Sequence, residues 1–154
     1  MPTIRPAIPG DIPDLIAMIA ALARHHDDAA SVTRETLFRD AFGASRFLHI
    51  LIADGGTGPV GYAALLSLAQ LHYGRRGMDL HHLFVTDLCR GQGIGRQLLQ
   101  AALGFARDLD ASYVTVGTHP DNRKAQDFYL KCGFAGLNLA VPRFSYDLTR
   151  DGVR

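Results

Sequence analysis

The sequence predicts an α+β fold in which a mixed, mostly antiparallel central sheet is flanked by helices. Short apolar runs typical of strands are interspersed with longer segments of helical periodicity, and turn-forming residues separate them. One apolar run leads through a glycine-rich turn directly into a helical segment. At 154 residues the chain suits one domain covering residues 1–154, and no repeat or shift in composition marks a boundary.

The first half is expected to contain two helices and three strands. Asp11 and Asp14 stand in the first turn of the first helix, where the helix dipole favours acidic side chains, and Thr33 is placed to cap the second. Residues 54–58 form a turn by composition. The expected elements are a strand at 3–7, helices at 10–24 and 33–41, and strands at 47–53 and 60–68.

The second half is expected to add helices on either side of a further strand and then to close the sheet. Gly133 is placed to end the last helix. The expected elements are a strand at 78–85, a helix at 96–109, a strand at 112–117, a helix at 122–131, and closing segments near residue 134 and at 143–148.

Composition excludes several classes of protein. The 16 Lys and Arg residues nearly balance the 15 Asp and Glu residues, so the basic patch or stripe of a nucleic-acid-binding protein is not expected. The apolar stretches are too short or too interrupted to span a membrane, and the first residues lack the apolar region of a signal peptide. Cys89 and Cys132 do not make a disulfide framework, which favours a reducing, cytoplasmic location.

The segment 90–95, Arg-Gly-Gln-Gly-Ile-Gly, is the most informative stretch of the chain. A strand, a tight glycine turn and a helix start place several main-chain N–H groups around one point, backed by the positive end of the helix dipole, which is a cradle for an anion such as phosphate. The spacing excludes two common phosphate loops. The P-loop requires four residues between its glycines and a following Gly-Lys, and the dinucleotide fingerprint requires G-x-G-x-x-G.

The pattern Arg90-x-x-Gly93-x-Gly95 instead resembles the pyrophosphate loop of the GCN5-related N-acetyltransferase (GNAT) superfamily, which binds acetyl-CoA. Residues 122–134 resemble the N-x-x-A-x-x-F-Y-x-x-x-G-F signature that follows the fifth strand of these enzymes. The order of segments in the first half is similar to the spermidine/spermine (diamine) acetyltransferase branch. The branch carries Leu-Glu-Asp where this chain reads Leu80-His81-His82.

This resemblance implies the GNAT acyl-CoA N-acyltransferase fold, acetyl-CoA as the acetyl donor, a primary amine of a small molecule as the acceptor, no metal, and a homodimer. It also implies direct attack of the amine in a ternary complex. Main-chain groups of the strand end would pair with the pantetheine arm, and the loop and the later helix start would border the coenzyme. The implied cofactor-binding residues are Leu83, Phe84, Val85, Arg90, Gly91, Gln92, Gly93, Ile94, Gly95, Arg96, Asn122, Lys124 and Ala125.

Tyr129 and His81 are the catalytic candidates. The ordinary pKa of a tyrosine lies close to that of an alkyl thiol, so Tyr129, which coincides with the family's acid tyrosine, suits protonation of the leaving thiolate. The alternative is that Tyr129 only packs its helix onto the sheet. His81 stands where the branch has a glutamate base, and imidazole is a competent substitute near neutral pH. Strand alternation is expected to place His81 and His82 on opposite faces. The alternative is a pair of hydrogen-bonded histidines at a strand start.

The acceptor is less well defined by the sequence. The candidates for binding it are His26, Asp27, Asp28 and His82, although Asp27 and Asp28 also fit a solvated turn. Arg75 and Arg76 would repel a polycation or bind a carboxylate, so a smaller amine such as an amino acid is as consistent as a polyamine. Two alternatives stay open: transfer to a protein or peptide amine, and an acetyl-CoA-binding protein without turnover.

Seven histidines also raise the question of a metal site. The adjacent pairs His25-His26 and His81-His82 lack the i,i+4 helical spacing, and the chain contains neither H-E-x-x-H nor paired C-x-x-C motifs. No functional metal is expected.

Overall fold

The computed structural model describes residues 1–139 and 141–149. They divide into two compact units, Met1–Gly117 and the described residues from Thr118 onward. Within the described ranges, no helix combines the length and the apolar composition needed to cross a lipid bilayer.

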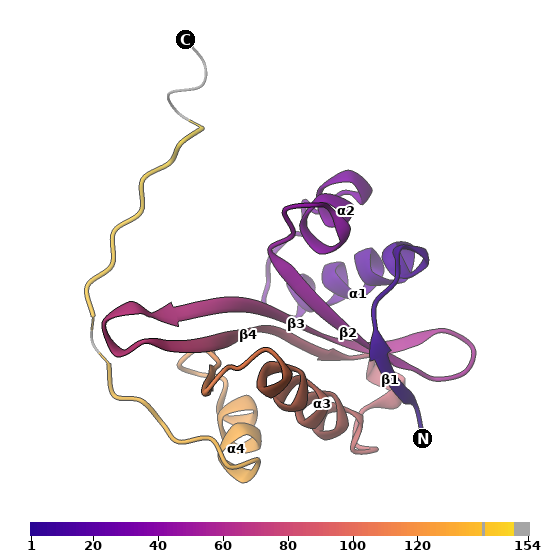
Figure 1. Ribbon diagram of the computed structural model, residues 1–154. Helices are drawn as coiled ribbons and strands as arrows, with labels where there is room; N and C mark the ends of the chain where they lie inside the picture. The colour runs from indigo at the N-terminus through magenta and orange to yellow at the C-terminus, as the bar shows by residue number, and fades with distance from the viewer. Residues whose placement is uncertain (140, 150–154) are drawn as a thin grey trace. The chain divides into compact units, whose positions relative to one another are not determined.

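The first unit is built on a five-stranded sheet in the order β1-β2-β3-β4-β5 (Figure 1). The first four strands pair antiparallel with their neighbours, and only β4 and β5 pair parallel. This arrangement confirms the predicted mixed, mostly antiparallel sheet. The strands are β1 (Thr3–Pro6), β2 (Leu48–Asp54), β3 (Pro59–Gln70), β4 (Arg75–Val85) and β5 (Tyr113–Thr115).

Helices cover both faces of this sheet. Figure 1 shows α1 (Ile12–His25) and α2 (Arg34–Phe42) on one face and α3 (Ile94–Asp108) on the other. Short 3₁₀ turns, η1 (Pro9–Asp11), η2 (Leu71–Tyr73) and η3 (Asp87–Cys89), stand before α1, in the β3–β4 connection and before the glycine loop. The sheet is therefore the middle layer of the unit, and its two faces are buried against different helices.

The alternation of side chains along each strand supplies both cores. The α1/α2 face is filled by Ile50, Ile52, Tyr62, Ala64 and Phe84 together with Ile12, Leu15, Met18, Leu37 and Ala41. On the other face the buried side of α3 consists of Ile94, Leu98, Leu99, Ala102 and Ala106. Gly61 allows that helix to approach, because an added Cβ would lie 3.2 Å from Leu98 Cδ1 and 2.7 Å from the Phe84 carbonyl oxygen.

Local hydrogen bonds define where the first two helices begin. Thr33 accepts a hydrogen bond from the Thr36 N–H at 3.1 Å, and the Thr33 N–H donates back to the Thr36 hydroxyl at 2.9 Å, so the predicted cap of α2 is confirmed. At the start of α1, the buried carboxylate of Asp11 accepts from the Ile8 N–H at 2.8 Å and from both terminal nitrogens of Arg5 at 2.8 and 2.9 Å. This ion pair ties the first strand to the first helix.

The second unit contains α4 (Arg123–Lys131) and an extended segment that follows it. Asn122 caps the helix by accepting from the Ala125 N–H at 3.1 Å, and Gly133, with φ of 97°, turns the chain at the other end. The predicted closing segments near residue 134 and at 143–148 are wrong as strands, since the described residues there pair with no other strand. Strands are stable only when a neighbouring strand satisfies their main chain.

Candidate functional site

A β-bulge interrupts β4 at His81. Ala64 of β3 lies opposite His82, but the next residue, Leu65, lies opposite Leu80, so His81 has no partner in β3. One extra residue in one strand bends that strand and disturbs the alternation of its side chains. The bulge marks the point where β4 changes from a conventional paired strand into the segment that leads to the glycine loop.

The bulge overturns the expectation that His81 and His82 lie on opposite faces. Their imidazole rings stack nearly parallel, with centroids 4.4 Å apart and an interplanar angle of 9°. His81 is exposed and His82 is half-buried. The two rings therefore form one stacked pair that is open to solvent on the His81 side. Strand alternation failed as a guide because the register shift adds a residue between Leu80 and His82.

His82 is hydrogen-bonded to a residue that was not among the predicted site residues. The Tyr62 hydroxyl lies 2.8 Å from His82 Nδ1, and the Tyr62 side chain is fully buried in β3. Burial, and then the neighbouring His81 and His26, lowers the pKa of His82 to about 4. His82 is therefore neutral at physiological pH. A tyrosine within the apolar run of β3 is the signal that could have identified this contact.

The end of β4 presents unpaired main-chain groups on one edge. The Thr86 N–H donates to the Val60 carbonyl at 2.9 Å, and hydrogen-bonded and non-bonded pairs alternate along an antiparallel ladder. Leu83 and Val85 therefore direct their N–H and C=O groups away from β3. Pairing with β5 stops at Asp79, so no strand of the described chain covers this edge. An extended amide-bearing ligand can pair with such an edge as an added strand would.

The glycine loop has the geometry predicted for it. Gly91 and Gly93 adopt φ of 75° and 82°, and an added Cβ at either residue would meet open space. Gly93 is the N-cap of α3, and the first intrahelical bond runs from the Gln97 N–H to the Gly93 carbonyl. The N–H groups of residues 94–96 have no acceptor within the described chain, so they are available to an anion at the positive end of the helix. The helix begins two residues earlier than predicted because the left-handed Gly93 starts it.

Arg90 is held against the end of β4. Its Nε donates to the Val85 carbonyl at 2.9 Å, its Nη1 lies 3.0 Å from Asp87 Oδ1, and its guanidinium lies over the Phe84 ring at 5.5 Å. Gln92, the other polar side chain of the loop, donates to the Leu88 carbonyl at 3.4 Å. These contacts place the Arg90 charge between the loop and the strand end.

A surface hollow of about 420 Å³ lies between α1 and the end of β4. Its lining combines apolar side chains with Arg24 and His25 from α1 and Asp87 and Arg90 from the strand end. Arg24 has no ion-pair partner among the residues that the structure describes. Arg24 and His25, like Tyr62, were absent from the predicted site.

The predicted acceptor residues divide into two groups. His26, which follows α1, contributes to the lowered pKa of His82, after burial and His81. Asp27 and Asp28 are exposed, and the Asp28 carboxylate accepts from the Ala29 N–H at 2.8 Å. Asp27 has φ of 55°, typical of a tight turn. Within the described chain neither carboxylate contacts the histidines.

The remaining predicted residues lie in the second unit. Asn122, Lys124 and Ala125 form the first turn of α4, and Tyr129 lies in its last turn. The Tyr129 ring packs edge to face against Phe134, with centroids 5.5 Å apart. Burial, with a smaller contribution from Cys132, raises the pKa of Tyr129 to about 12, so its hydroxyl keeps its proton at neutral pH.

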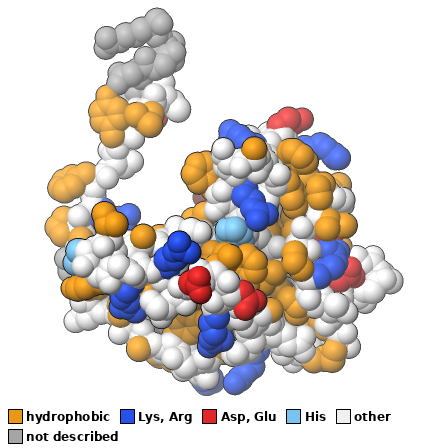
Figure 2. Space-filling view, in the orientation of Figure 1, with side chains coloured by type: hydrophobic (Ala, Val, Ile, Leu, Met, Phe, Trp, Pro, Cys, Tyr) orange, Lys and Arg blue, Asp and Glu red, His pale blue; other side chains and the backbone are white. Residues whose placement is uncertain are grey.

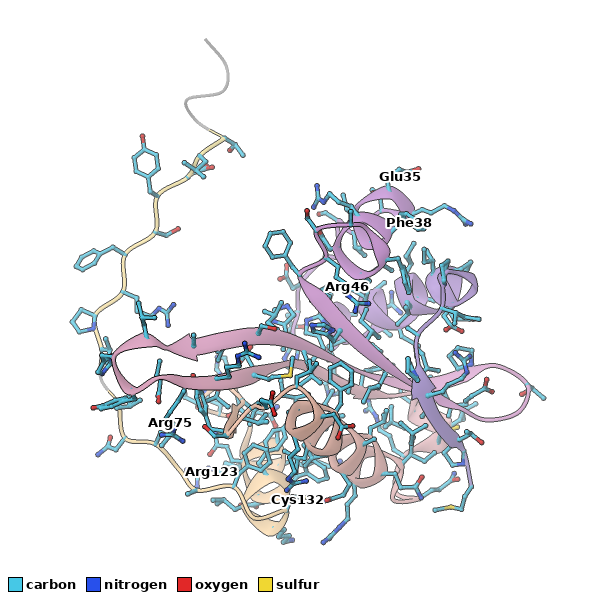
Figure 3. The ribbon with its side chains drawn as sticks, viewed as in Figure 1. Glu35, Phe38, Arg46, Arg75, Arg123 and Cys132 are labelled. Atoms are coloured by element: carbon cyan, nitrogen blue, oxygen red, sulfur yellow. The ribbon has the colours of Figure 1, made fainter. Side chains whose placement is uncertain are left out.

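Two further observations bear on Arg75 and on metals. Arg75 lies at the hairpin end of β4, where its guanidinium covers the Tyr113 ring at 5.1 Å (Figure 3). His81 lies six positions further along the strand, roughly 20 Å away, so Arg75 does not line the histidine group. In the part of the chain that the structure describes, no cluster of three or more His, Cys, Asp or Glu side chains is placed to hold a metal ion.

Comparisons with known proteins agree with this architecture. The acetyltransferase (GNAT) family model matches residues 15–134. The chain is 29% identical to the thialysine N-epsilon-acetyltransferase of Sus scrofa over 98% of this chain and 94% of that protein. It is 32% identical to N-acetyltransferase 8B of Rattus norvegicus over 84% of this chain and 54% of that protein.

Solved structures share the fold at low sequence identity. An aminoglycoside acetyltransferase from an uncultured soil metagenomic sample, solved with trehalose, has a TM-score of 0.77 at 21% identity and covers 95% of each chain. A ribosomal-protein-alanine N-acetyltransferase from Brucella melitensis has a TM-score of 0.72 at 18% identity over 94% of this chain and 100% of that one. These proteins are named for acceptors of different classes, and at this identity the likeness establishes the fold alone.

Proposed function

Because the chain belongs to the acetyltransferase (GNAT) family, whose curated relatives are N-acetyltransferases, we propose that it transfers an acetyl group from acetyl-CoA to the primary amine of a small molecule. The observation that carries the proposal is the continuity of the site. One strand supplies the histidine pair, a free main-chain edge and the glycine loop in direct succession.

The donor fits this chain by three features. Residues 91–96 offer unsatisfied N–H groups at the start of α3, where a pyrophosphate is favoured. Leu83 offers its N–H and C=O groups, and Val85 its N–H group, to the amides of the pantetheine arm, while the Val85 carbonyl accepts from Arg90. Arg90, which is paired with Asp87, and Arg24 add positive charge to the hollow at the strand end. When bound, acetyl-CoA supplies the acetyl group as a thioester.

His81 is proposed as the base, either directly or through a water molecule. A primary amine is mostly protonated at neutral pH and must lose a proton before it can attack directly in the ternary complex. His81 is exposed at the bulge, next to the free edge of β4. Its neighbour His82 has a pKa lowered to about 4, so His82 does not compete for that proton near neutral pH.

Tyr129 is proposed as the acid that protonates the leaving thiolate. Its hydroxyl keeps its proton at neutral pH because burial raises its pKa to about 12. The residue lies in the last turn of α4 at the position of the family's acid tyrosine. Asn122, Lys124 and Ala125, at the start of the same helix, are proposed to border the coenzyme arm.

The acceptor is proposed to be an amino acid or related small amine. The thialysine N-epsilon-acetyltransferases to which the chain is similar are named for such an acceptor. His26, His81 and His82 replace the carboxylates that would attract a polyamine, and Asp27 and Asp28 are proposed to attract the ammonium group as it approaches.

A homodimer is also proposed. Large apolar side chains are exposed along the segment that follows α4, including Leu139 at 72% and Phe144 at 96% (Figure 2). Apolar side chains that are exposed in one copy are typical of surfaces that a second copy covers.

The test is thiol release from acetyl-CoA across amino acids, diamines, polyamines, aminoglycosides and short peptides. Saturable turnover with a small amine supports the proposal. Turnover with peptides alone would transfer the assignment to a protein acceptor. Tight acetyl-CoA binding without turnover on any amine would identify a non-catalytic coenzyme-binding protein.

A further inference from the structure

The hydrogen bond between Tyr62 and His82 has one favourable direction. The Tyr62 side chain is fully buried, and its hydroxyl has no partner in the described chain other than His82 Nδ1 at 2.8 Å. If Nδ1 carried the proton and donated it to Tyr62, the phenol proton would be buried without an acceptor, which costs free energy. Tyr62 therefore donates its proton, and Nδ1 accepts it.

This direction sets the tautomer of His82. A neutral imidazole whose Nδ1 accepts must carry its proton on Nε2. Burial also raises the pKa of Tyr62 well above its ordinary value, so the phenol remains a donor. His82 Nε2 has no partner among the described residues, and it is not among their buried, unsatisfied atoms, so it reaches solvent. The exposed group of His82 is therefore an N–H donor.

We propose that Tyr62 fixes His82 as a neutral Nε2–H donor that reads a hydrogen-bond-accepting oxygen on the acceptor, so that the site selects amines bearing a carboxylate, carbonyl or hydroxyl group over diamines and polyamines. This inference rests on the proposed function. A carboxylate at the same position, such as the aspartate of the diamine branch, would accept a hydrogen bond from a second ammonium group. A neutral N–H donor cannot, and it leaves that ammonium unpaired.

The groups that face His82 support this assignment from each neighbouring element. His81 stacks on its ring from β4, His26 approaches from the end of α1, and Tyr62 lies beneath it in β3. Among the described residues that contact or electrostatically influence His82, none is a carboxylate. An ammonium group next to His82 would therefore have no compensating charge in contact with this ring.

The first measurement is the tautomer itself. Nitrogen-detected NMR of the histidine rings should show His82 in the Nε2–H form and neutral from pH 8 down to pH 5, and Tyr62→Phe should raise the pH at which His82 takes up a proton. His72→Phe, in exposed η2 at the hairpin end, removes a distant histidine and should leave the His82 signals unchanged. His82 in the Nδ1–H form would overturn the inference without any need for turnover.

The second measurement is specificity. We compare kcat/KM for ω-amino acids, ω-amino alcohols and α,ω-diamines of matched chain length. The wild-type protein should prefer the oxygen-bearing amines by about tenfold, the order expected for one hydrogen bond to a charged or polar acceptor. The double variant Tyr62→Phe/His82→Phe keeps a ring stacked on His81 and leaves no orphaned hydroxyl, so it should fold, and kcat/KM for the oxygen-bearing amines should fall to the level of the matched diamines.

The outcomes separate the two levels of the argument. A wild-type preference for diamines, or a preference for oxygen that survives in the double variant, would overturn the inference and leave the acetyltransferase proposal intact. Absence of turnover with every amine would overturn the proposed function and, with it, the selection of acceptors. A melting temperature of the double variant close to that of the Tyr62→Phe variant would show that the specificities are compared on folded protein.

Discussion

The hydroxyl oxygen of Tyr62 lies 2.8 Å from Nδ1 of His82. This contact joins the neighbouring strands β3 and β4 next to the stacked imidazoles of His81 and His82. The bulge at His81 brings the two rings together, and Tyr62 makes them chemically different. Burial, and then His81 and His26, lowers the pKa of His82, and Tyr62 occupies its Nδ1, whereas His81 is exposed. Two adjacent residues of the same type can therefore have separate roles.

Gly93→Glu should abolish acetyl-CoA binding. Gly93 has φ of 82°, and an added Cβ would project into open space. A glutamate there would place a negative charge at the first N–H groups of α3, where the anionic pyrophosphate is proposed to bind. Isothermal titration calorimetry measures the loss. Gly104→Glu adds the same charge later in α3, at a position where an added Cβ meets no other atom within 4 Å. This variant should bind acetyl-CoA normally, and equal affinity of the two variants for acetyl-CoA would refute the loop assignment.

Tyr129→Phe should lower kcat by roughly 100-fold, the lower end of the range for loss of a general acid, and should leave the Kd for acetyl-CoA within about twofold of wild type. The phenylalanine keeps the edge-to-face packing on Phe134, so the change isolates the hydroxyl group. Tyr73→Phe, at an exposed position in η2, is the matched control. Near-normal turnover of Tyr129→Phe would show that the ring only packs.

Asp11→Asn should destabilise the protein by about 2 kcal/mol in urea unfolding, because it removes one partner of a largely buried ion pair. Asp11 is 5% exposed and accepts two hydrogen bonds from Arg5. Asp40→Asn removes an equally short contact with Arg39 at the surface and should cost much less, because solvent screens an exposed pair. Equal costs would show that burial of Asp11 is not what matters.

The Arg5–Asp11 pair also predicts a dependence of stability on pH. Hydrogen bonding to Arg5 holds the pKa of Asp11 below its ordinary value, so the unfolded chain binds a proton at a higher pH than the folded chain. The stabilisation is therefore complete at neutral pH and is lost as the pH falls through the folded pKa. The slope of unfolding free energy against pH on the acid side should be smaller in Asp11→Asn than in wild type.

Phe144→Asp should shift the protein from dimer to monomer in analytical ultracentrifugation. Phe144 is 96% exposed in the single chain, and a charge at this position opposes burial against a second copy. Phe47→Asp, at a residue 71% exposed outside the C-terminal segment, should leave the mass unchanged. A wild-type protein that sediments as a monomer at all concentrations would contradict the dimer proposal.

Local signals in the sequence were sufficient for the fold and for the glycine turn, but not for the relationship between the histidines. Thr33 and Gly133 act through their own turns, so their roles at helix ends follow from a few neighbouring residues. The stacking of His81 on His82 depends on the register of β4 against β3, and the pairing of His82 with Tyr62 depends on a contact 20 residues away in sequence. Strand alternation cannot report a register shift.

The closing segments show the opposite limit. Residues 137–148 carry exposed apolar side chains at intervals, which favours strands, yet within the described chain they pair with no other strand. The alternation of apolar side chains in a strand indicates which of them become buried. It does not indicate which segment or which chain supplies the neighbouring strand. The sequence could therefore predict the tendency of this segment but not its partner.

If His81 is the base, kcat/KM should fall along a limb of unit slope as the pH is lowered through the range in which a histidine takes up a proton, because an imidazolium cannot accept one from the amine. His82 should add no second ionisation in this range, since burial, and then His81 and His26, lowers its pKa to about 4.

The same profile measured on His81→Gln should lack this limb and lie roughly 100-fold lower at neutral pH. His72→Gln, which removes an exposed histidine at the hairpin end, should reproduce the wild-type curve. A limb that persists in His81→Gln would assign the titration to another group and remove His81 as the base. A slope of two in the wild-type protein would mean that His82 titrates in the same range, and would contradict the lowering of its pKa by burial, His81 and His26.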